Sequence, residues 1–121
     1  MSTKIDNWLE TMVKGWEGCD VDMALSVFAE NVEYWESPYS LVNPNDLRRL
    51  WQSIKVDKNT KVSVSVFCSC EDSYAVQWRA TWAGEDRTRQ QKSGVYLVRL
   101  NSEGKCDYFY RTTSELEVVD E

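Results

Sequence analysis

The sequence contains no histidine among its 121 residues. Without an imidazole, a Ser-His-Asp or Cys-His nucleophile system is excluded, and so is every metal site that depends on histidine. Acid–base chemistry near neutral pH must therefore come from Asp, Glu, Tyr, Lys or Cys side chains whose pKa is shifted by their surroundings.

Long apolar runs and basic blocks are absent as well. No segment approaches the ~18–20 apolar residues of a membrane helix, and the first residues, MSTKIDNW, lack the basic and apolar regions of a secretory signal. We therefore expect a cytoplasmic protein without a membrane partner. The net charge of −6 and the scattered basic residues disfavour nucleic acid as a partner, because its phosphates would be repelled.

The cysteine pattern gives no metal site. In a chain without a secretory signal, the four cysteines are expected to be free thiols. Cys68 and Cys70 should share one face of a strand and pack there as small side chains. No CxxC motif supplements them, so no metal is expected, and no Gly-rich phosphate loop indicates a cofactor.

Apolar residues at helical spacing predict two helices at the start of the chain. The first covers residues 5–16, where one stripe is apolar. Asp20 can cap the second, whose inner face is formed by Val21, Ala24, Leu25 and Phe28.

A short strand and a third helix follow. The strand lies around residues 32–36 and ends before Pro38. Asn43 and Pro44 are typical of a helix start, and the apolar face of this third helix continues to Ile54.

From residue 58 the apolar period changes to two, which indicates half-buried antiparallel strands. We expect them over residues 58–70, 74–82, 87–100 and 105–113, joined by turns at 71–73, 83–86 and 101–104. Gly104 suits a left-handed turn position, and the acidic end after the last strand should be loose. Helices followed by a meander predict an α+β fold, with three N-terminal helices on one face of a curved antiparallel sheet, in one domain over residues 1–121.

This order of elements resembles the nuclear transport factor 2-like superfamily and, within it, the SnoaL-like (polyketide-cyclase-like) group. The stretches that carry the resemblance are MALSVFAENVEYWESP, DLRRLWQSI, AVQWRATW and GVYLVRLNSEGK. The resemblance covers nearly the whole chain. It implies a cone-shaped α+β barrel (a cystatin-like fold) with an apolar pocket at its open end, and a homodimer through the outer sheet face. It names no activity, because the superfamily includes isomerases, cyclases, dehydratases, epoxide hydrolases and non-catalytic carriers.

Known catalytic patterns of the superfamily match this chain poorly. The ketosteroid isomerase pattern, an aspartate base with a tyrosine and a protonated acid, falls on Ser37, Met12 and approximately Tyr96. Scytalone-dehydratase-like chemistry needs histidine, and no acid-Arg-acid set of an epoxide hydrolase can be assigned. SnoaL-like cyclases use a late-strand aspartate, for which Asp107 is the nearest match.

The catalytic candidates that remain are Glu36, Asp107 and Arg111, with Tyr108 and Tyr110 beside them. Glu36 or Asp107 would act as the base, although Glu36 could equally be a solvated edge residue. Arg111 could bind an anionic substrate bidentately, or it could form an ion pair at the end of the sheet.

Six tryptophans exceed what the core alone requires, so the rings nearest the open end should meet a flat apolar or aromatic ligand. In NVEYWESPYS, strand alternation places Tyr34 and Glu36 on one side and Trp35 on the other, and either side could face the pocket. The expected ligand-binding residues are Trp16, Tyr34, Trp35, Tyr39, Trp51, Trp78 and Tyr108.

Three functions are compatible with these features. The first is a cofactor-independent isomerase, cyclase or dehydratase that acts on a small apolar or aromatic molecule by carboxylate acid–base chemistry. The second is a non-catalytic module that binds such a molecule. The third is a dimeric protein-interaction domain whose pocket is vestigial, which should expose a large apolar patch.

Overall fold

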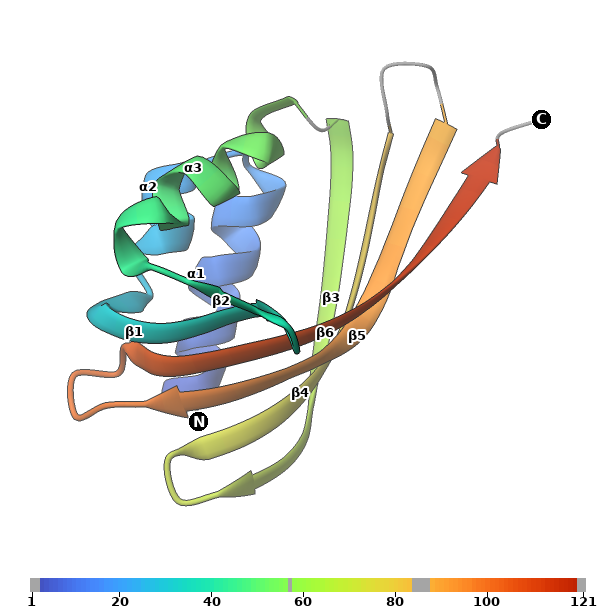
Figure 1. Ribbon diagram of the computed structural model, residues 1–121. Coiled ribbons are helices and arrows are strands. Elements are labelled where there is room, and N and C mark those ends of the chain that lie inside the picture. The colour runs from blue at the N-terminus through green and yellow to red at the C-terminus, as the bar shows by residue number, and fades with distance from the viewer. Residues whose placement is uncertain (1–2, 57, 84–87, 120–121) are drawn as a thin grey trace.

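In the described part of the chain, three α-helices cover one face of a curved six-stranded sheet (Figure 1). The computed structural model describes residues 3–56, 58–83 and 88–119. The strand order is β2-β1-β6-β5-β4-β3. The elements are α1 Lys4–Glu17, α2 Val21–Leu25, β1 Phe28–Ser37, β2 Ser40–Val42, α3 Leu47–Trp51, β3 Lys58–Cys70, β4 Ser73–Ala83, β5 Thr88–Leu100 and β6 Cys106–Val119, with 3-10 turns η1 Pro44–Asp46 and η2 Gln52–Val56.

Helix α1 confirms the predicted first helix. The Thr3 hydroxyl accepts from the backbone N–H of Asp6, and the Asp6 carboxylate accepts from the backbone N–H of Thr3, which is a capping box. The predicted apolar stripe faces the sheet, and all its members are buried: Ile5, Trp8, Leu9, Met12 and Trp16. No helix in the described ranges is both long enough and apolar enough to span a membrane.

The second and third helices differ from the prediction. Asp20 caps α2 as expected, through the backbone N–H of Met23, but α2 ends at Leu25. Phe28 therefore does not belong to a helix face and instead begins β1. The third helix is divided into a short α-helix between two 3-10 turns, with Asn43 capping the first turn.

Strands β1 and β6 are longer than their sequence pattern indicates. The predicted short strand is the ten-residue β1, which pairs antiparallel with β2 and parallel with β6. The other neighbours pair antiparallel, as expected. The last strand continues to Val119, so the expectation of a loose end after residue 113 is wrong for residues up to 119. The turn predicted at residues 83–86 falls largely outside the described residues.

Cys68 and Cys70 do not pack on the apolar face, contrary to the prediction. The register of β3 against β4 shifts between Val66 and Cys68. This bulge turns the following side chains to the other face, so that both thiols are exposed. The thiol of Cys106, in contrast, is completely buried. The hairpin at residues 101–104 is confirmed, with Gly104 at a φ of 78°.

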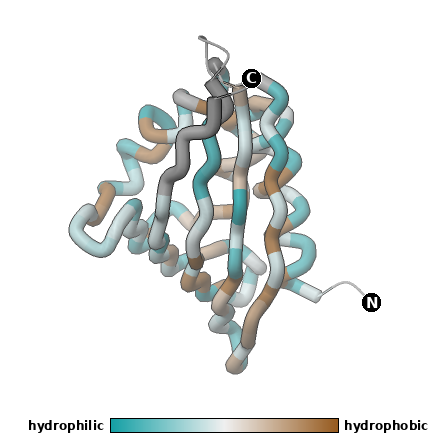
Figure 2. Tube along the Cα trace, turned by 90° about the vertical axis from the view of Figure 1, so that its right-hand side faces the viewer, coloured by the Kyte–Doolittle hydropathy of each residue, from teal (hydrophilic) through white to brown (hydrophobic). Residues whose placement is uncertain are grey.

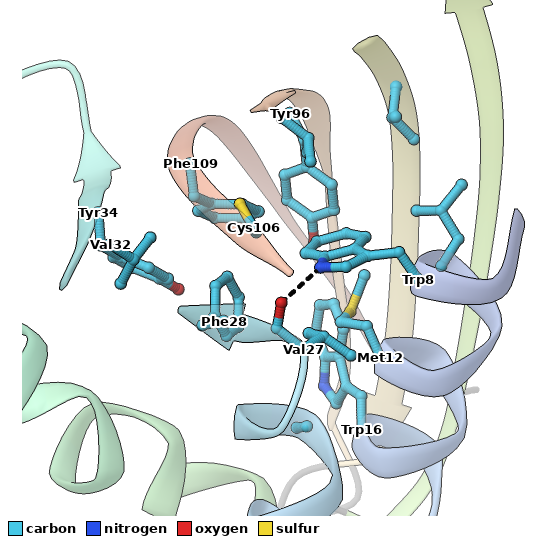
Figure 3. Packing of buried hydrophobic residues seen from close by; sticks show 14 of the residues in the cluster. Trp8, Met12, Trp16, Val27, Phe28, Val32, Tyr34, Tyr96, Cys106 and Phe109 are labelled. Atoms are coloured by element: carbon cyan, nitrogen blue, oxygen red, sulfur yellow. Dashed lines mark hydrogen bonds between the residues drawn. The ribbon is translucent and has the colours of Figure 1, made fainter. Parts of the chain in front are cut away.

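The core lies between the helices and the concave face of the sheet. Figure 3 shows Trp8, Phe28 and Phe109 meeting there, with ring centres of Phe28 and Phe109 5.4 Å apart. The indole N–H of Trp8 donates to the carbonyl oxygen of Val27 at 2.8 Å, which satisfies a polar group that burial would otherwise penalise. Figure 2 looks onto the opposite, helix-free face, where hydrophilic and hydrophobic residues are mixed.

Candidate functional site

A cavity of about 240 Å³ lies between the helices and the concave face of the sheet. Five parts of the chain contribute to its wall: α1, β1, the α3–η2 segment, β4 with β5, and β6. The lining residues are Trp16, Tyr34, Glu36, Leu50, Trp51, Ile54, Trp82, Lys92 and Arg111. The wall therefore combines aromatic rings with a carboxylate and two cationic side chains.

The parallel pairing of β1 with β6 brings Glu36 and Arg111 together. Trp35 lies opposite Tyr110 in this pairing, and each of the two charged residues follows directly in its strand. A 2.6 Å ion pair joins Arg111 Nη2 to Glu36 Oε1. Only 17% of the Arg111 side chain and 23% of the Glu36 side chain are exposed, so water screens this pair much less than a surface pair.

The ion pair leaves polar atoms without partners. Glu36 Oε2 and Arg111 Nε are buried and have no hydrogen-bond partner in the described part of the chain. The guanidinium of Arg111 also lies 5.4 Å from the ring centre of Trp78, a cation–π contact that stabilises its charge. Buried polar atoms usually have partners, and such unpaired atoms at a cavity wall are typical of a functional site.

Two buried tyrosines lie close to the ion pair. Tyr34 and Tyr96 are only 1% and 2% exposed. Burial raises the pKa of Tyr34 well above its ordinary value, the Glu36 carboxylate raises it further, and Arg111 opposes both. Burial likewise raises the pKa of Tyr96. Both phenols therefore keep their protons at physiological pH and can act as hydrogen-bond donors.

These buried acids predict a loss of stability in alkali. The pKa values of Tyr34, Tyr96 and Cys106 are raised in the folded state, that of Cys106 by burial to about 12. Above the ordinary pKa of a thiol, about 8.5, the unfolded chain loses protons that the folded chain retains, so the free energy of unfolding falls as pH rises. Urea midpoints should fall steadily between about pH 8 and about pH 11.

The Tyr96→Phe variant provides the comparison, because it keeps the ring and removes the phenol. Its urea midpoint should depend less steeply on pH above about 10, the ordinary pKa of tyrosine. If the urea midpoints of the two proteins fell equally steeply with pH, the phenol of Tyr96 would not contribute to the loss of stability in alkali.

The Glu36–Arg111 ion pair predicts how substitutions of its two members change the free energy of unfolding. Arg111→Met should lower the free energy of unfolding by about 2–3 kcal/mol, because the largely buried Glu36 carboxylate then lacks a counter-charge. The double variant with Glu36→Gln should recover part of this loss, and urea denaturation of both single variants and the double variant measures the coupling. Strictly additive changes would show that the two side chains do not interact in solution.

Several predicted site residues are brought together by the fold. Trp16, Tyr34 and Trp51 line the cavity beside Glu36 and Arg111. Of the two possible sides of β1, the side that carries Tyr34 and Glu36 faces the cavity. Trp78 is buried in contact with the Arg111 guanidinium and with the ring of Trp16, at 5.9 Å between centres.

Other predicted residues lie elsewhere. Trp35 donates its indole N–H to Glu33 at 2.8 Å, outside the cavity, and Tyr39 is 96% exposed. Asp107 accepts from Arg99 at 2.7 Å, and Arg99 also lies over the ring of Tyr108 at 5.6 Å.

Asp107 and Arg111 therefore lie apart from each other and form ion pairs with different residues. Three residues of strand lie between them, so their Cα atoms are roughly 13 Å apart along β6. Asp107 faces Arg99 at one end of the strand, whereas Arg111 faces Glu36 at the cavity.

Sequence reasoning missed four lining residues, namely Leu50, Ile54, Trp82 and Lys92. Three of them belonged to predicted apolar faces and were expected in the core. Lys92 lies over the ring of Trp82, with 5.4 Å between its Nζ and the ring centre. The signal for Lys92 was its alternation with Tyr96, which is buried on the same face of β5.

The residues that could hold a metal are dispersed. Among the described residues, no group of three or more Cys, Asp and Glu side chains is arranged to hold a metal ion. The cavity wall contributes a single carboxylate, Glu36.

The fold is that of the nuclear transport factor 2-like proteins, as the sequence resemblance implies. The Delta 5-3-ketosteroid isomerase of a Mycobacterium species is similar with a TM-score of 0.77 at 11% identity, over 95% of this chain and 100% of that one. An NTF2-like protein of unknown function from an Exiguobacterium species gives a TM-score of 0.71 at 14% identity, over 93% and 98%. The epoxide hydrolase/cyclase-like enzyme SalBIII gives 0.75 at 19% identity, over 92% and 91%.

These likenesses concern the fold and not the activity, because the identities are low and the solved structures differ in function. No protein-family model matches the sequence, and no curated protein matches it significantly. The function must therefore be argued from the site.

Proposed function

We propose that this protein is a cofactor-independent enzyme that moves protons on a small apolar or aromatic substrate, as an isomerase, cyclase or dehydratase of the SnoaL-like type. The observation that carries the proposal is the Glu36–Arg111 ion pair in the wall of an aromatic cavity, with Glu36 Oε2 left without a partner. A carboxylate held in place among rings is suited to general-base catalysis.

The cavity volume limits the substrate. An engineered cavity of about 150 Å³ in another protein holds one benzene molecule, so about 240 Å³ suits one or two rings. A four-ring molecule would require the helices to move. Flat rings would stack on Trp16, Trp51 or Trp82, and the ion pair would orient the polar end of the substrate.

The geometry supports a proton transfer next to a carbonyl group. The Glu36 carboxylate would take a proton from a carbon adjacent to the carbonyl, and the electron pair of the C–H bond would form an enolate. The neutral Tyr34 hydroxyl would donate a hydrogen bond to the enolate oxygen, while Arg111 holds Glu36 in position. Return of the proton to a more distant carbon completes an isomerisation.

The direct test is turnover of one- and two-ring β,γ-unsaturated ketones, followed by the ultraviolet absorbance of the conjugated product. The proposal expects saturable turnover above the rate of the buffer. Saturable binding of these ketones without any turnover would contradict the enzymatic proposal and favour the non-catalytic binding module.

The binding module has one observation of its own in its favour. Arg111 already holds Oε1 of Glu36 at 2.6 Å, so one oxygen of this carboxylate has a fixed partner before any ligand arrives. In that case Glu36 and Arg111 would orient a ligand without reacting with it.

We also propose that the outer sheet face joins two copies of the chain, as the family resemblance implies. Val95 and Leu97 on β5 are 37% and 42% exposed, and partly exposed aliphatic residues on a sheet face support an interface. Sedimentation equilibrium at micromolar concentration should give twice the chain mass, and a monomer would contradict this proposal.

A further inference from the structure

The strand β3 presents an unusual free edge. It is the last strand of the sheet, and β4 is its only strand neighbour in the described ranges (Figure 1). Its segment 62–70, VSVSVFCSC, contains no charge, proline or glycine. Free edges normally carry lysine or proline that prevents pairing with another strand, and an uncharged run of high β-propensity favours such pairing.

The backbone groups at this edge can be identified from one contact. The backbone N–H of Val62 donates to Glu17 Oε2 at 2.7 Å and therefore points away from β4. The β3–β4 register is unbroken from Lys61 to Val66, so alternation directs the N–H groups of Val64 and Val66 to the same edge. Glu17 ends α1, where the helix dipole disfavours a carboxylate, and its contact with Val62 compensates for that position.

A groove runs along this edge, between α1 and β3. Its volume is about 300 Å³, and it is lined by Asp6, Leu9, Glu10, Val13, Val64 and Val66. Its apolar floor lies beneath two carboxylates of α1, and Glu17 adds a third at the end of the helix. Lys14, paired with Glu10 at 2.9 Å, offsets only part of this negative charge.

We propose that the free edge of β3 binds an extended segment of a partner protein, in which basic and β-branched residues alternate, as a seventh strand of the sheet. Backbone hydrogen bonds to Val64 and Val66 would supply affinity. The aliphatic stems of lysine or arginine would cover Leu9 and Val13 while their charged ends reach the carboxylates of α1.

A second copy of the chain fits this edge less well. Antiparallel pairing about Val64 would place Val62 opposite Val66, which is sterically acceptable. It would also bring two acidic α1 helices to the same side of the joined sheet, where like charges repel. The basic segment is therefore the occupant that the charges favour.

The experiment uses the complete chain and two synthetic peptides, Ac-VKVKVKV-NH2 and Ac-VEVEVEV-NH2, with affinity measured by isothermal titration calorimetry. The basic peptide should bind at least about tenfold more tightly than the acidic one. Val64→Pro removes the edge N–H without removing a bond to β4 and should weaken binding at least about tenfold, since backbone hydrogen bonds are lost. Val64→Thr keeps the N–H and should bind normally.

Hydrogen exchange on the unsubstituted protein gives a second readout that does not depend on the folding of Val64→Pro. Exchange of the Val64 and Val66 amide protons should slow when the basic peptide is added. Equal affinity for the two peptides, or unchanged exchange at both amides, would overturn the proposal. So would a concentration-dependent dimer that Val64→Pro abolishes, because the edge would then belong to a second copy.

Discussion

Replacing Glu36 by glutamine is expected to lower kcat at least about 100-fold while leaving ligand affinity within a few-fold of its original value. Glutamine keeps the shape of the side chain and can still contact Arg111, but it cannot accept a proton. General-base catalysis typically contributes 10²–10⁴-fold to a rate, so the loss should appear in kcat and not in KM. Turnover of a β,γ-unsaturated ketone and fluorescence titration with the saturated ketone measure the two effects separately.

Glu33→Gln is the matched control for this prediction. Glu33 lies on the same strand but accepts from Trp35 outside the cavity, so its replacement should leave kcat unchanged. If Glu36→Gln retained full turnover, Glu36 would not be the base. If it changed affinity alone, the binding module would be the better account of the site.

Gly94→Ala is expected to destabilise the protein by about 3 kcal/mol or more. A Cβ atom at Gly94 would lie 1.9 Å from the carbonyl oxygen of Thr112 and 3.2 Å from Nε1 of Trp78. Because the nearest atom is backbone, β5 and β6 would have to separate at the centre of the sheet, and overpacking without room to relax costs more than a side-chain adjustment. Urea denaturation gives the change in unfolding free energy.

Gly104→Ala is the control for this substitution. Nothing lies within 4 Å of a Cβ atom there, but the φ of 78° is unfavourable for alanine. The expected loss is therefore only about 1 kcal/mol, from backbone strain alone. Similar losses for both variants would show that strands β5 and β6 are less closely packed at Gly94 than the structure indicates.

The sequence predicts the helical stripe of α1 and the strand alternation of β4 correctly, because each follows from a local periodicity. Local periodicity could not predict the parallel pairing of β1 with β6, which joins segments more than 70 residues apart. It also could not reveal the bulge that exposes Cys68 and Cys70, since Val and Cys keep a period of two through that point, with Phe67 between Val66 and Cys68.

The same distinction applies to the site. Residue type alone makes Glu36 and Arg111 candidates, but their contact depends on the β1–β6 pairing. Strand alternation allows either side of β1 to face the pocket. The fold places the side that carries Tyr34 and Glu36 at the cavity. Tyr39, which follows the proline of the same segment, points into solvent because the chain turns there toward β2.

The most direct test of the pocket is an NMR titration of the six tryptophan indole N–H signals with a one- or two-ring aromatic ketone. If the cavity binds the ketone, the signals of Trp16, Trp51 and Trp82, which line it, should shift in a saturable manner. The signals of Trp8 and Trp35, whose indole N–H groups donate elsewhere, should shift little. Saturable shifts confined to Trp35, or no shift at any ligand concentration, would contradict a ligand site in this cavity.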